Sequence, residues 1–299
     1  MSDDPTIWSR LVIAVVGGDE REREIARRAA TTGAEVRAFG IPWPDAGIAG
    51  VQRSESAAAA LEGARVALFP IPGIDDEGHL FAPQSPVAIL PDRELLAAMA
   101  PAAHIILGYP DERLTAAAAA LGIGLHEYES DRELMLLRGP AICEGALELA
   151  IRHTDVTIHA SPVGVVGQGT IGSLMTQTLI ALGARVHVFA RNPVQRATAY
   201  TAGAQPHRLD ELATLAPELA MIFSSVPAPV VDTDTLERLP AGSLVMDLAA
   251  PPGGVNLALA ERCGHVAVWA RGMGRRAPVT VGASQWQGIR KRIVAALEG

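Results

Sequence analysis

The feature that most constrains the fold is a regular alternation of short apolar runs with Ala-rich stretches of helical periodicity. The first run, at 11–16, is continuously apolar, which is typical of a strand buried on both faces of a parallel sheet. Further strands are expected at 35–39, 66–69, 105–107 and 124–126, and helices at 92–99 and 111–121. The alternation predicts an α/β fold built on a doubly wound parallel sheet.

The pattern then starts again. After a helix expected at 141–153, strands are predicted at 163–166, 185–189, 221–223, 244–246 and 266–268, with a closing helix at 284–297. We therefore expect two doubly wound α/β domains with a cleft between them. The first would cover 1–150 and the second 151–278, with the junction somewhere in 139–160. The remaining 279–299 is expected to pack back on the first domain.

Composition excludes several classes of protein. The 299 residues include 25 Lys and Arg against 33 Asp and Glu, which gives a net charge of −8 and disfavours a nucleic-acid-binding surface. No apolar stretch approaches the ~20 residues of a membrane-spanning helix, and the acidic N-terminus is unlike a signal peptide. The two cysteines fit no metal or disulfide spacing. A cytoplasmic globular protein without a metal site is expected.

The strongest motif is a glycine turn in the second half of the chain. Gly167, Gly169 and Gly172 have the spacing G-x-G-x-x-G and lie between a predicted strand and an amphipathic helix. A second strand follows within about thirty residues, which is the context of a dinucleotide-binding Rossmann domain. The first glycine permits the tight turn, the second admits the pyrophosphate and the third lets helix and strand pack closely. We expect a dinucleotide at the start of this helix.

The residues after the second strand indicate which dinucleotide binds. An NAD site has Asp or Glu there to hold the ribose 2′-OH, whereas this chain reads Phe189-Ala190-Arg191-Asn192. Arg191 could bind a 2′-phosphate, which favours NADP. In the alternative, Arg191 is a solvated surface residue, the adenosine end is loosely held, and NAD is the cofactor.

Two later strand ends are expected near the nicotinamide, because ligands in such sheets lie beyond the carboxyl ends of the strands. They are 224–227 and 247–254, and the turn at 271–276 would close over the ring. Asp247 could instead hydrogen-bond a neighbouring loop. The residues predicted to contact the cofactor are Gly167, Gln168, Gly169, Thr170, Ile171, Gly172, Arg191, Asn192, Ser224, Ser225, Val226, Pro227, Asp247, Ala249 and Gly272.

The first domain has a partial echo of the glycine turn, Gly17-Gly18-Asp19, without the third glycine. It could hold a second dinucleotide, but a loop that lines the cleft is the favoured interpretation. Turns that contain Pro70, Pro72 and Gly108 follow other strands of this domain and would shape a small pocket. For proton transfer, His153 and Glu144 near the junction are the candidates, although a histidine there could be structural.

These residues resemble one known family, the A subunits of dipicolinate synthase. The resemblance runs over nearly the whole chain and is most specific in Glu144-Gly145 and in the string His-Thr-Asp-x-Thr-Ile-His at 153–159. It continues through the glycine turn, Ala190-Arg191, and Asp247-Leu248-Ala249 before a Pro-Gly-Gly. It implies a two-domain dehydrogenase fold and oxidation of hydroxytetrahydrodipicolinate to pyridine-2,6-dicarboxylate, with NADP as hydride acceptor.

The resemblance also implies a role in sporulation and, as partner, a second, flavoprotein-like subunit. We further expect a homo-oligomer, as is common for a dehydrogenase of this kind. The residues that would contact the cyclic dicarboxylate substrate are Gly18, Asp19, Pro70, Pro72, Gly108, Gly145, Arg275 and Arg276.

The chain departs from the family pattern where basic residues are usual, with Pro251 before Pro-Gly-Gly and Val279 after a late Ala-Pro. A dicarboxylate needs paired positive donors. Arg275 and Arg276 could replace them, or the substrate could be a different small molecule. A non-catalytic nucleotide-binding component of a two-subunit complex is a third interpretation.

Overall fold

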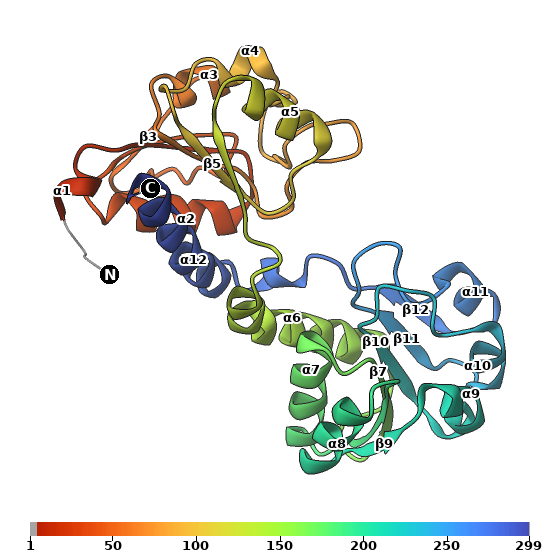
Figure 1. Ribbon diagram of the computed structural model, residues 1–299. Coiled ribbons are helices and arrows are strands. Elements are labelled where there is room, and N and C mark those ends of the chain that lie inside the picture. The colour runs from red at the N-terminus through yellow and green to blue at the C-terminus, as the bar shows by residue number, and fades with distance from the viewer. Residues whose placement is uncertain (1–4, 299) are drawn as a thin grey trace. The chain divides into compact units, whose positions relative to one another are not determined.

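The computed structural model describes residues 5–298, which form two compact units. One comprises Met1–Arg138 together with Ala277–Gly299, and the other comprises Gly139–Arg276. Both are α/β units with a central parallel sheet, as the alternating pattern predicts (Figure 1).

The first unit contains a six-stranded sheet of order β3-β2-β1-β4-β5-β6, and every pairing is parallel. Its strands are β1 (Val12–Val16), β2 (Glu35–Phe39), β3 (Val51–Arg53), β4 (Val66–Leu68), β5 (His104–Leu107) and β6 (Gly124–Glu127). The central strands are continuously apolar because both faces are covered. The core of this unit includes Val16, Phe69 and Ile105.

Helices α1 (Pro5–Trp8), α2 (Glu20–Ala30), α3 (Ala57–Leu61), α4 (Arg93–Leu96) and α5 (Glu112–Ala120) belong to this unit. The C-terminal helix α12 (Pro278–Glu298) belongs to it as well and packs against α2. The rings of Trp8 and Trp286 lie 6.0 Å apart, centroid to centroid, which joins the two ends of the chain.

The second unit repeats the same topology in the order β12-β11-β10-β7-β8-β9, again with parallel pairings. Its strands are β7 (Pro162–Val166), β8 (Arg185–Phe189), β9 (Gln205–His207), β10 (Met221–Ser224), β11 (Leu244–Asp247) and β12 (Val266–Trp269). Its helices are α7 (Thr170–Ala181), α8 (Pro193–Thr201), α9 (Leu212–Leu215), α10 (Thr233–Arg238) and α11 (Leu257–Arg262), with short 3-10 turns η1 (Leu209–Glu211), η2 (Ala216–Glu218) and η3 (Met273–Arg276).

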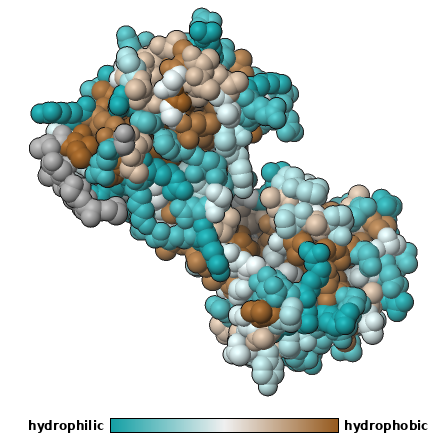
Figure 2. Space-filling model, viewed as in Figure 1, coloured by the Kyte–Doolittle hydropathy of each residue, from teal (hydrophilic) through white to brown (hydrophobic). Residues whose placement is uncertain are grey.

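The chain leaves the first unit inside helix α6 (Arg132–His153), which includes Pro140. The division therefore falls after Arg138, earlier than residue 150, and the return to the first unit comes at Ala277. Among residues 5–298, no helix has the length and apolarity that a membrane span requires. On the face seen in Figure 2, hydrophilic residues cover much of both units, with hydrophobic residues in smaller groups between them.

Candidate dinucleotide-binding site

The glycine turn connects β7 to α7, and each of its three glycines meets a different steric demand. Gly167 has φ +92°, a backbone conformation that side chains disfavour, and a Cβ there would come within 2.6 Å of Val226 Cγ2. A Cβ on Gly172 would collide with the carbonyl oxygen of Gly167. Gly169 is the N-cap of α7, and a Cβ on it would meet no described atom within 4 Å. The start of α7 is therefore open to a ligand.

A pocket of about 380 Å³ lies at this turn. It collects residues at the ends of three neighbouring strands, β7, β8 and β10, at the carboxyl edge of the sheet, together with Leu209 after β9. Its lining consists of Gly167, Gln168, Gly169, Phe189, Ala190, Arg191, Asn192, Gln195, Leu209, Ser225, Val226 and Pro227. Backbone amides and a helix N-terminus at one end suit the phosphates of a dinucleotide.

Eight of the residues predicted to contact the cofactor line this pocket: Gly167, Gln168, Gly169, Arg191, Asn192, Ser225, Val226 and Pro227. Thr170, Ile171 and Gly172 lie in the first turn of α7 without lining it. Sequence reasoning missed Gln195 and Leu209, and it did not select Phe189 and Ala190. Gln195 could have been found from its place in the first turn of α8, whereas nothing in the local sequence marks Leu209.

The edge of the pocket beyond β8 carries positive charge. Ala190 and the exposed Arg191 stand where an NAD site has a carboxylate. Asn192 is the N-cap of α8, and its Oδ1 accepts a 2.8 Å hydrogen bond from the Val194 amide. The turn is thus fixed by its own cap, which leaves the Arg191 side chain at the pocket rim.

Asp247 has a structural environment. It is buried at the end of β11, where one carboxylate oxygen accepts from the Ala249 amide at 2.9 Å and the other from the Gly254 amide at 2.7 Å. This is the loop-bonding alternative considered from the sequence. The buried Ala249 in turn accepts a 3.1 Å bond from Trp269 Nε1. Neither residue lines the pocket, and neither does the fully buried Ser224.

The residues expected to take part in chemistry lie on α6 and on η3. Glu144 Oε2 forms a 2.5 Å ion pair with Arg276, and both side chains are exposed. Gly145 allows η3 to approach α6, because a Cβ there would lie 3.0 Å from Met273 Cβ. The predicted proton-transfer carboxylate and one predicted substrate-binding arginine are therefore in contact.

The other members of this group are also exposed. Gly272, with φ +66°, precedes η3, and Arg275 Nε donates a 3.4 Å bond to its carbonyl. Arg275 itself is exposed. His153 is exposed in the last turn of α6. Cys143, by contrast, is buried on the same helix, and burial raises the pKa of its thiol to about 12.

In the first unit the glycine turn is filled by the chain's own carboxylates. Asp19 is the N-cap of α2, and both of its oxygens bind the Arg21 guanidinium at 2.8 Å. Glu22 stands at the position that Gly172 has in the other unit. Its two oxygens accept from the amides of Asp19 at 2.8 Å and Ile71 at 2.7 Å. Burial raises the pKa of Glu22 to about 7. This arrangement favours the loop interpretation over a second dinucleotide.

The predicted substrate residues of the first unit lie around this carboxylate. A Cβ on Gly18 would collide with the Glu22 side chain, and a Cβ on Gly17 would lie 3.1 Å from Pro70 Cγ. Gly108 lies so close to the carbonyl of Ile71 that a Cβ would collide with it. Pro70 is buried, and Pro72 is partly buried. The loops that follow β1, β4 and β5 therefore meet at the carboxyl edge of this sheet.

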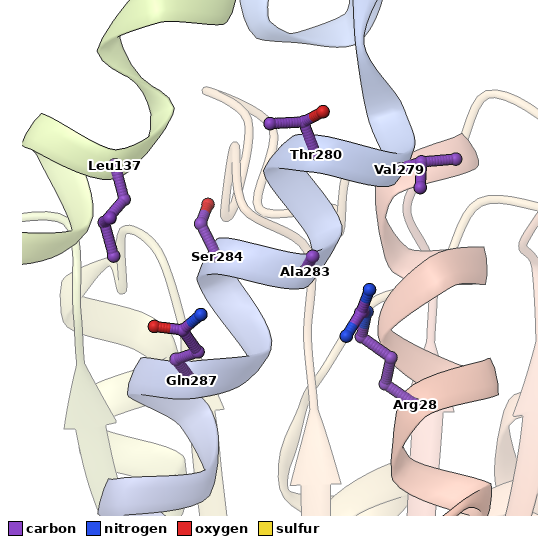
Figure 3. Close-up of a pocket in the computed structure, with 7 residues that line it drawn as sticks. All are labelled: Arg28, Leu137, Val279, Thr280, Ala283, Ser284 and Gln287. Atoms are coloured by element: carbon purple, nitrogen blue, oxygen red, sulfur yellow. The ribbon is translucent and has the colours of Figure 1, made fainter.

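A second cavity, of about 400 Å³, lies in the first unit and contains none of the predicted site residues. It runs along α12, with Leu137 of α6 on one side and Arg28 of α2 on the other (Figure 3). Thr280, Ser284 and Gln287 line it from α12. Among the described residues, no group of three or more His, Cys, Asp or Glu could hold a metal ion.

Comparison with known proteins agrees with this geometry. Residues 12–129 match the family model of the N-terminal domain of the dipicolinate synthase A subunit. Residues 148–261 match that of shikimate / quinate 5-dehydrogenase. The chain is 29% identical over 273 residues to the dipicolinate synthase A subunit of Bacillus subtilis (strain 168), covering 91% of this chain and 92% of that protein.

Solved structures show the same relationship. The crystal structure of the dipicolinate synthase A subunit from Bacillus halodurans has a TM-score of 0.86 at 27% identity, covering 93% of this chain and 96% of that one. The Bacillus subtilis structure has a TM-score of 0.85 at 27% identity, covering 96% and 97%. A transhydrogenase from Sinorhizobium meliloti, at 15% identity, shares the fold with a TM-score of 0.62, covering 92% and 90%. The chain is therefore similar over nearly its whole length to dipicolinate synthase A subunits, and it shares the fold of nicotinamide dinucleotide-binding dehydrogenases.

Proposed function

We propose that this chain is an NADP-dependent oxidoreductase that converts hydroxytetrahydrodipicolinate to pyridine-2,6-dicarboxylate. The observation that carries the proposal is the pocket of the second unit. There, an open helix N-terminus for phosphates and an arginine in place of the ribose-binding carboxylate line one cavity. The relatives, which are named as dipicolinate synthases, supply the substrate.

Cofactor binding is assigned to the eight predicted residues that line the pocket, with Gln195 and Leu209 added. The amides at the start of α7 would bind the pyrophosphate, because they carry the positive end of the helix dipole. The guanidinium of Arg191 would bind the 2′-phosphate, which NAD lacks. Bound here, NADP supplies the hydride acceptor.

The reaction requires the protein mainly to orient the substrate and to accept a proton from it. Hydroxytetrahydrodipicolinate loses water to give a dihydropyridine, which then loses a hydride and a proton to become aromatic. Glu144 is assigned as the acceptor of that proton, with His153 as the alternative, since both are exposed on α6. Arg275 and Arg276 are assigned to the substrate carboxylates.

Partners follow from the family. The relative is named as one subunit of an enzyme, so we infer a homo-oligomer of this chain that works with a second, flavoprotein-like subunit in the cytoplasm during sporulation. We assign the NADP site to the second unit, which also carries Glu144, His153, Arg275 and Arg276.

One observation favours a second function, oxidation of a different small substrate with the same cofactor. Arg276 is already neutralised by Glu144, and Pro251 and Val279 stand where the family usually has basic residues. A substrate with one carboxylate would need only Arg275.

The test mixes the purified chain with NADP and freshly generated hydroxytetrahydrodipicolinate. Nicotinamide reduction and pyridine absorbance should rise together, with one reduced cofactor per aromatic ring. Glu144→Gln should lower kcat by about 10²-fold. Glu148→Gln is the matched control, because Glu148 is also exposed on α6 and paired with an arginine.

If neither signal rises while NADP binds, the cognate flavoprotein-like partner is added. Activity restored by that partner would mean that the complex is the enzyme. No activity in its presence would overturn the substrate assignment and leave the second function.

A further inference from the structure

One charged side chain beside the pocket has no part in the cofactor contacts assigned so far. Arg196 lies in α8, one turn after the pocket edge, and is partly buried. Its Nη1 turns back to donate hydrogen bonds to the carbonyl oxygens of Ala190 at 2.9 Å and Arg191 at 2.7 Å. These are the first two carbonyls beyond β8, and both residues line the pocket.

The bonds constrain what this edge presents to a ligand. A carbonyl oxygen that faced the pocket would repel a phosphate, whereas one bound to a guanidinium is turned toward that donor. Because one nitrogen of Arg196 binds both carbonyl oxygens, it also fixes the peptide group that carries Arg191. The exposed Arg191 side chain therefore leaves the backbone from a fixed point. Fixing that point lowers the entropy lost when the side chain binds an anion.

The charges at this edge are otherwise unfavourable. Arg191 and Arg196 both lie at the N-terminal end of α8, where the helix dipole disfavours cations. Within residues 5–298 neither forms a salt bridge, and the nearby Asp210 pairs with Arg208 at 2.5 Å. Asp210 is therefore engaged by Arg208, and no described carboxylate is paired with Arg191 that would compete with a 2′-phosphate for it.

We propose that Arg196 is a positioning residue that makes the pocket selective for NADP over NAD. It acts through Arg191: its guanidinium holds the carbonyls of Ala190 and Arg191 so that the Arg191 side chain meets the 2′-phosphate. The inference rests on the proposed NADP site and adds to it a residue that does not line the pocket.

The test is a double-mutant cycle on the isolated binding step, which needs no substrate. Dissociation constants for NADPH and NADH are measured by fluorescence titration for the wild type, Arg191→Ala, Arg196→Ala and the double variant. Arg262→Ala removes the same charge from the exposed end of α11 and is the matched control. Thermal unfolding confirms that each variant is folded.

Arg191→Ala should weaken NADPH by about tenfold or more and leave NADH within about twofold. Arg196→Ala should weaken NADPH by about five- to tenfold, again without an effect on NADH, because only the 2′-phosphate contact is disturbed. In the Arg191→Ala background, Arg196→Ala should have no further effect. Arg262→Ala should change neither constant.

Two results would overturn the inference while leaving the NADP site intact. Equal weakening of NADPH and NADH by Arg196→Ala would make the residue merely structural. If the fold-changes of the two single variants in NADPH affinity multiply in the double variant, Arg196 acts as an independent contact or a long-range charge. If Arg191→Ala leaves the NADPH to NADH ratio unchanged, the proposed 2′-phosphate site itself is wrong, and the inference falls with it.

Discussion

At the scale of the residue, one position decides what each unit can bind. Gly172 and Glu22 are equivalent, because each lies five positions after the first glycine of its turn, Gly167 or Gly17. The glycine leaves room at the start of α7, whereas the Glu22 carboxylate accepts the amides of Asp19 and Ile71. An anion site is therefore open in the second unit and filled by the protein in the first.

Two glycines of the open turn, Gly172 and Gly169, should respond differently to alanine. Gly172→Ala forces a Cβ against the Gly167 carbonyl, so it should lower the free energy of unfolding by about 1–3 kcal/mol and weaken NADP binding. Gly169→Ala places its Cβ in open space where the pyrophosphate is expected, so it should weaken NADP with little change in stability. Urea unfolding and NADPH titration check both variants. A Gly169→Ala variant that binds NADPH normally would contradict the assigned approach of the phosphates.

Glu22 should make the stability of the first unit depend on pH. Burial raises its pKa from 4.5 to about 7, and this effect outweighs the opposing charge of Arg21. Over this pH range the folded chain therefore holds a proton that the unfolded chain has released. This carboxyl therefore costs stability as the pH rises from about 4.5 through 7. Relative to the wild type, the free energy of unfolding of Glu22→Gln should therefore rise by about 1–3 kcal/mol as the pH increases from 4.5 to 8.

Thermal unfolding of both proteins across that range is the measurement. A difference between variant and wild type that stays constant with pH would show that Glu22 remains ionised throughout. Glu20→Gln is the control, because Glu20 lies two residues earlier on the same helix and is less buried.

The sequence predicted this residue-level picture only where contacts are local. The glycine turn and Arg191 are recognisable because strand, turn, helix and second strand are contiguous. Leu209 reaches the pocket from the segment after β9, and Arg196 acts by folding back one helical turn. Glu22 bonds to Ile71, which is far away in sequence. Such contacts depend on tertiary packing that no local pattern encodes.

At the scale of the element, the central strands were predictable, and of the four edge strands β6 and β12 were predicted whereas β3 and β9 were not. Ten strands were expected and all ten form, because continuous apolar runs need burial on both faces. The outer strands β3 and β9 were missed, since they are short and partly exposed. Helix α6 starts at Arg132 rather than near 141, because Pro140 is accommodated inside it. Helix α12 likewise begins at Pro278, before the expected 284, with proline in its first turn.

Pairing of neighbouring strands also brings histidines together. His187 on β8 and His207 on β9 lie 3.0 Å apart between Nδ1 and Nε2. Burial lowers the pKa of both; the charge of His207 lowers that of His187 further, while Glu211 and Glu218 oppose the shift in His207. Each folded pKa lies below the ordinary value of 6.5, so this pair stabilises the fold above that pH and the stability is lost as the pH falls.

His207→Gln should therefore reduce the loss of stability on acidification below about pH 6.5. The expected observation is a smaller drop in the urea midpoint between about pH 7.5 and 5 than in the wild type. The exposed His153, replaced by Gln, is the matched control and should leave the drop unchanged. An unchanged drop in His207→Gln would mean that the pair is not the source of the acid sensitivity.

At the scale of the whole molecule, two units of one topology have different roles. Both sheets place a turn after the first central strand; in the second unit a pocket lies there, whereas in the first the carboxylates of Asp19 and Glu22 bind the turn. The sequence predicted two such domains from the restart of the pattern. It could not fix the exact division, because α6 runs unbroken from one unit into the other and the C-terminal residues return to the first.

This division of roles predicts one dinucleotide for each chain. Calorimetric titration of the purified protein with NADP should give a stoichiometry of one, because the first turn is occupied by Asp19 and Glu22. Gly169→Ala should weaken that single binding event without uncovering another. A stoichiometry of two would mean that the first unit also accepts a nucleotide.

The most direct test of the proposed NADP site is a crystal structure of the chain with NADP. We expect the pyrophosphate against the amides at the start of α7, the adenosine in the pocket beside Gln195 and Leu209, and the 2′-phosphate within hydrogen-bond distance of Arg191. Density for the nucleotide elsewhere, or a 2′-phosphate that points into solvent away from Arg191, would contradict it.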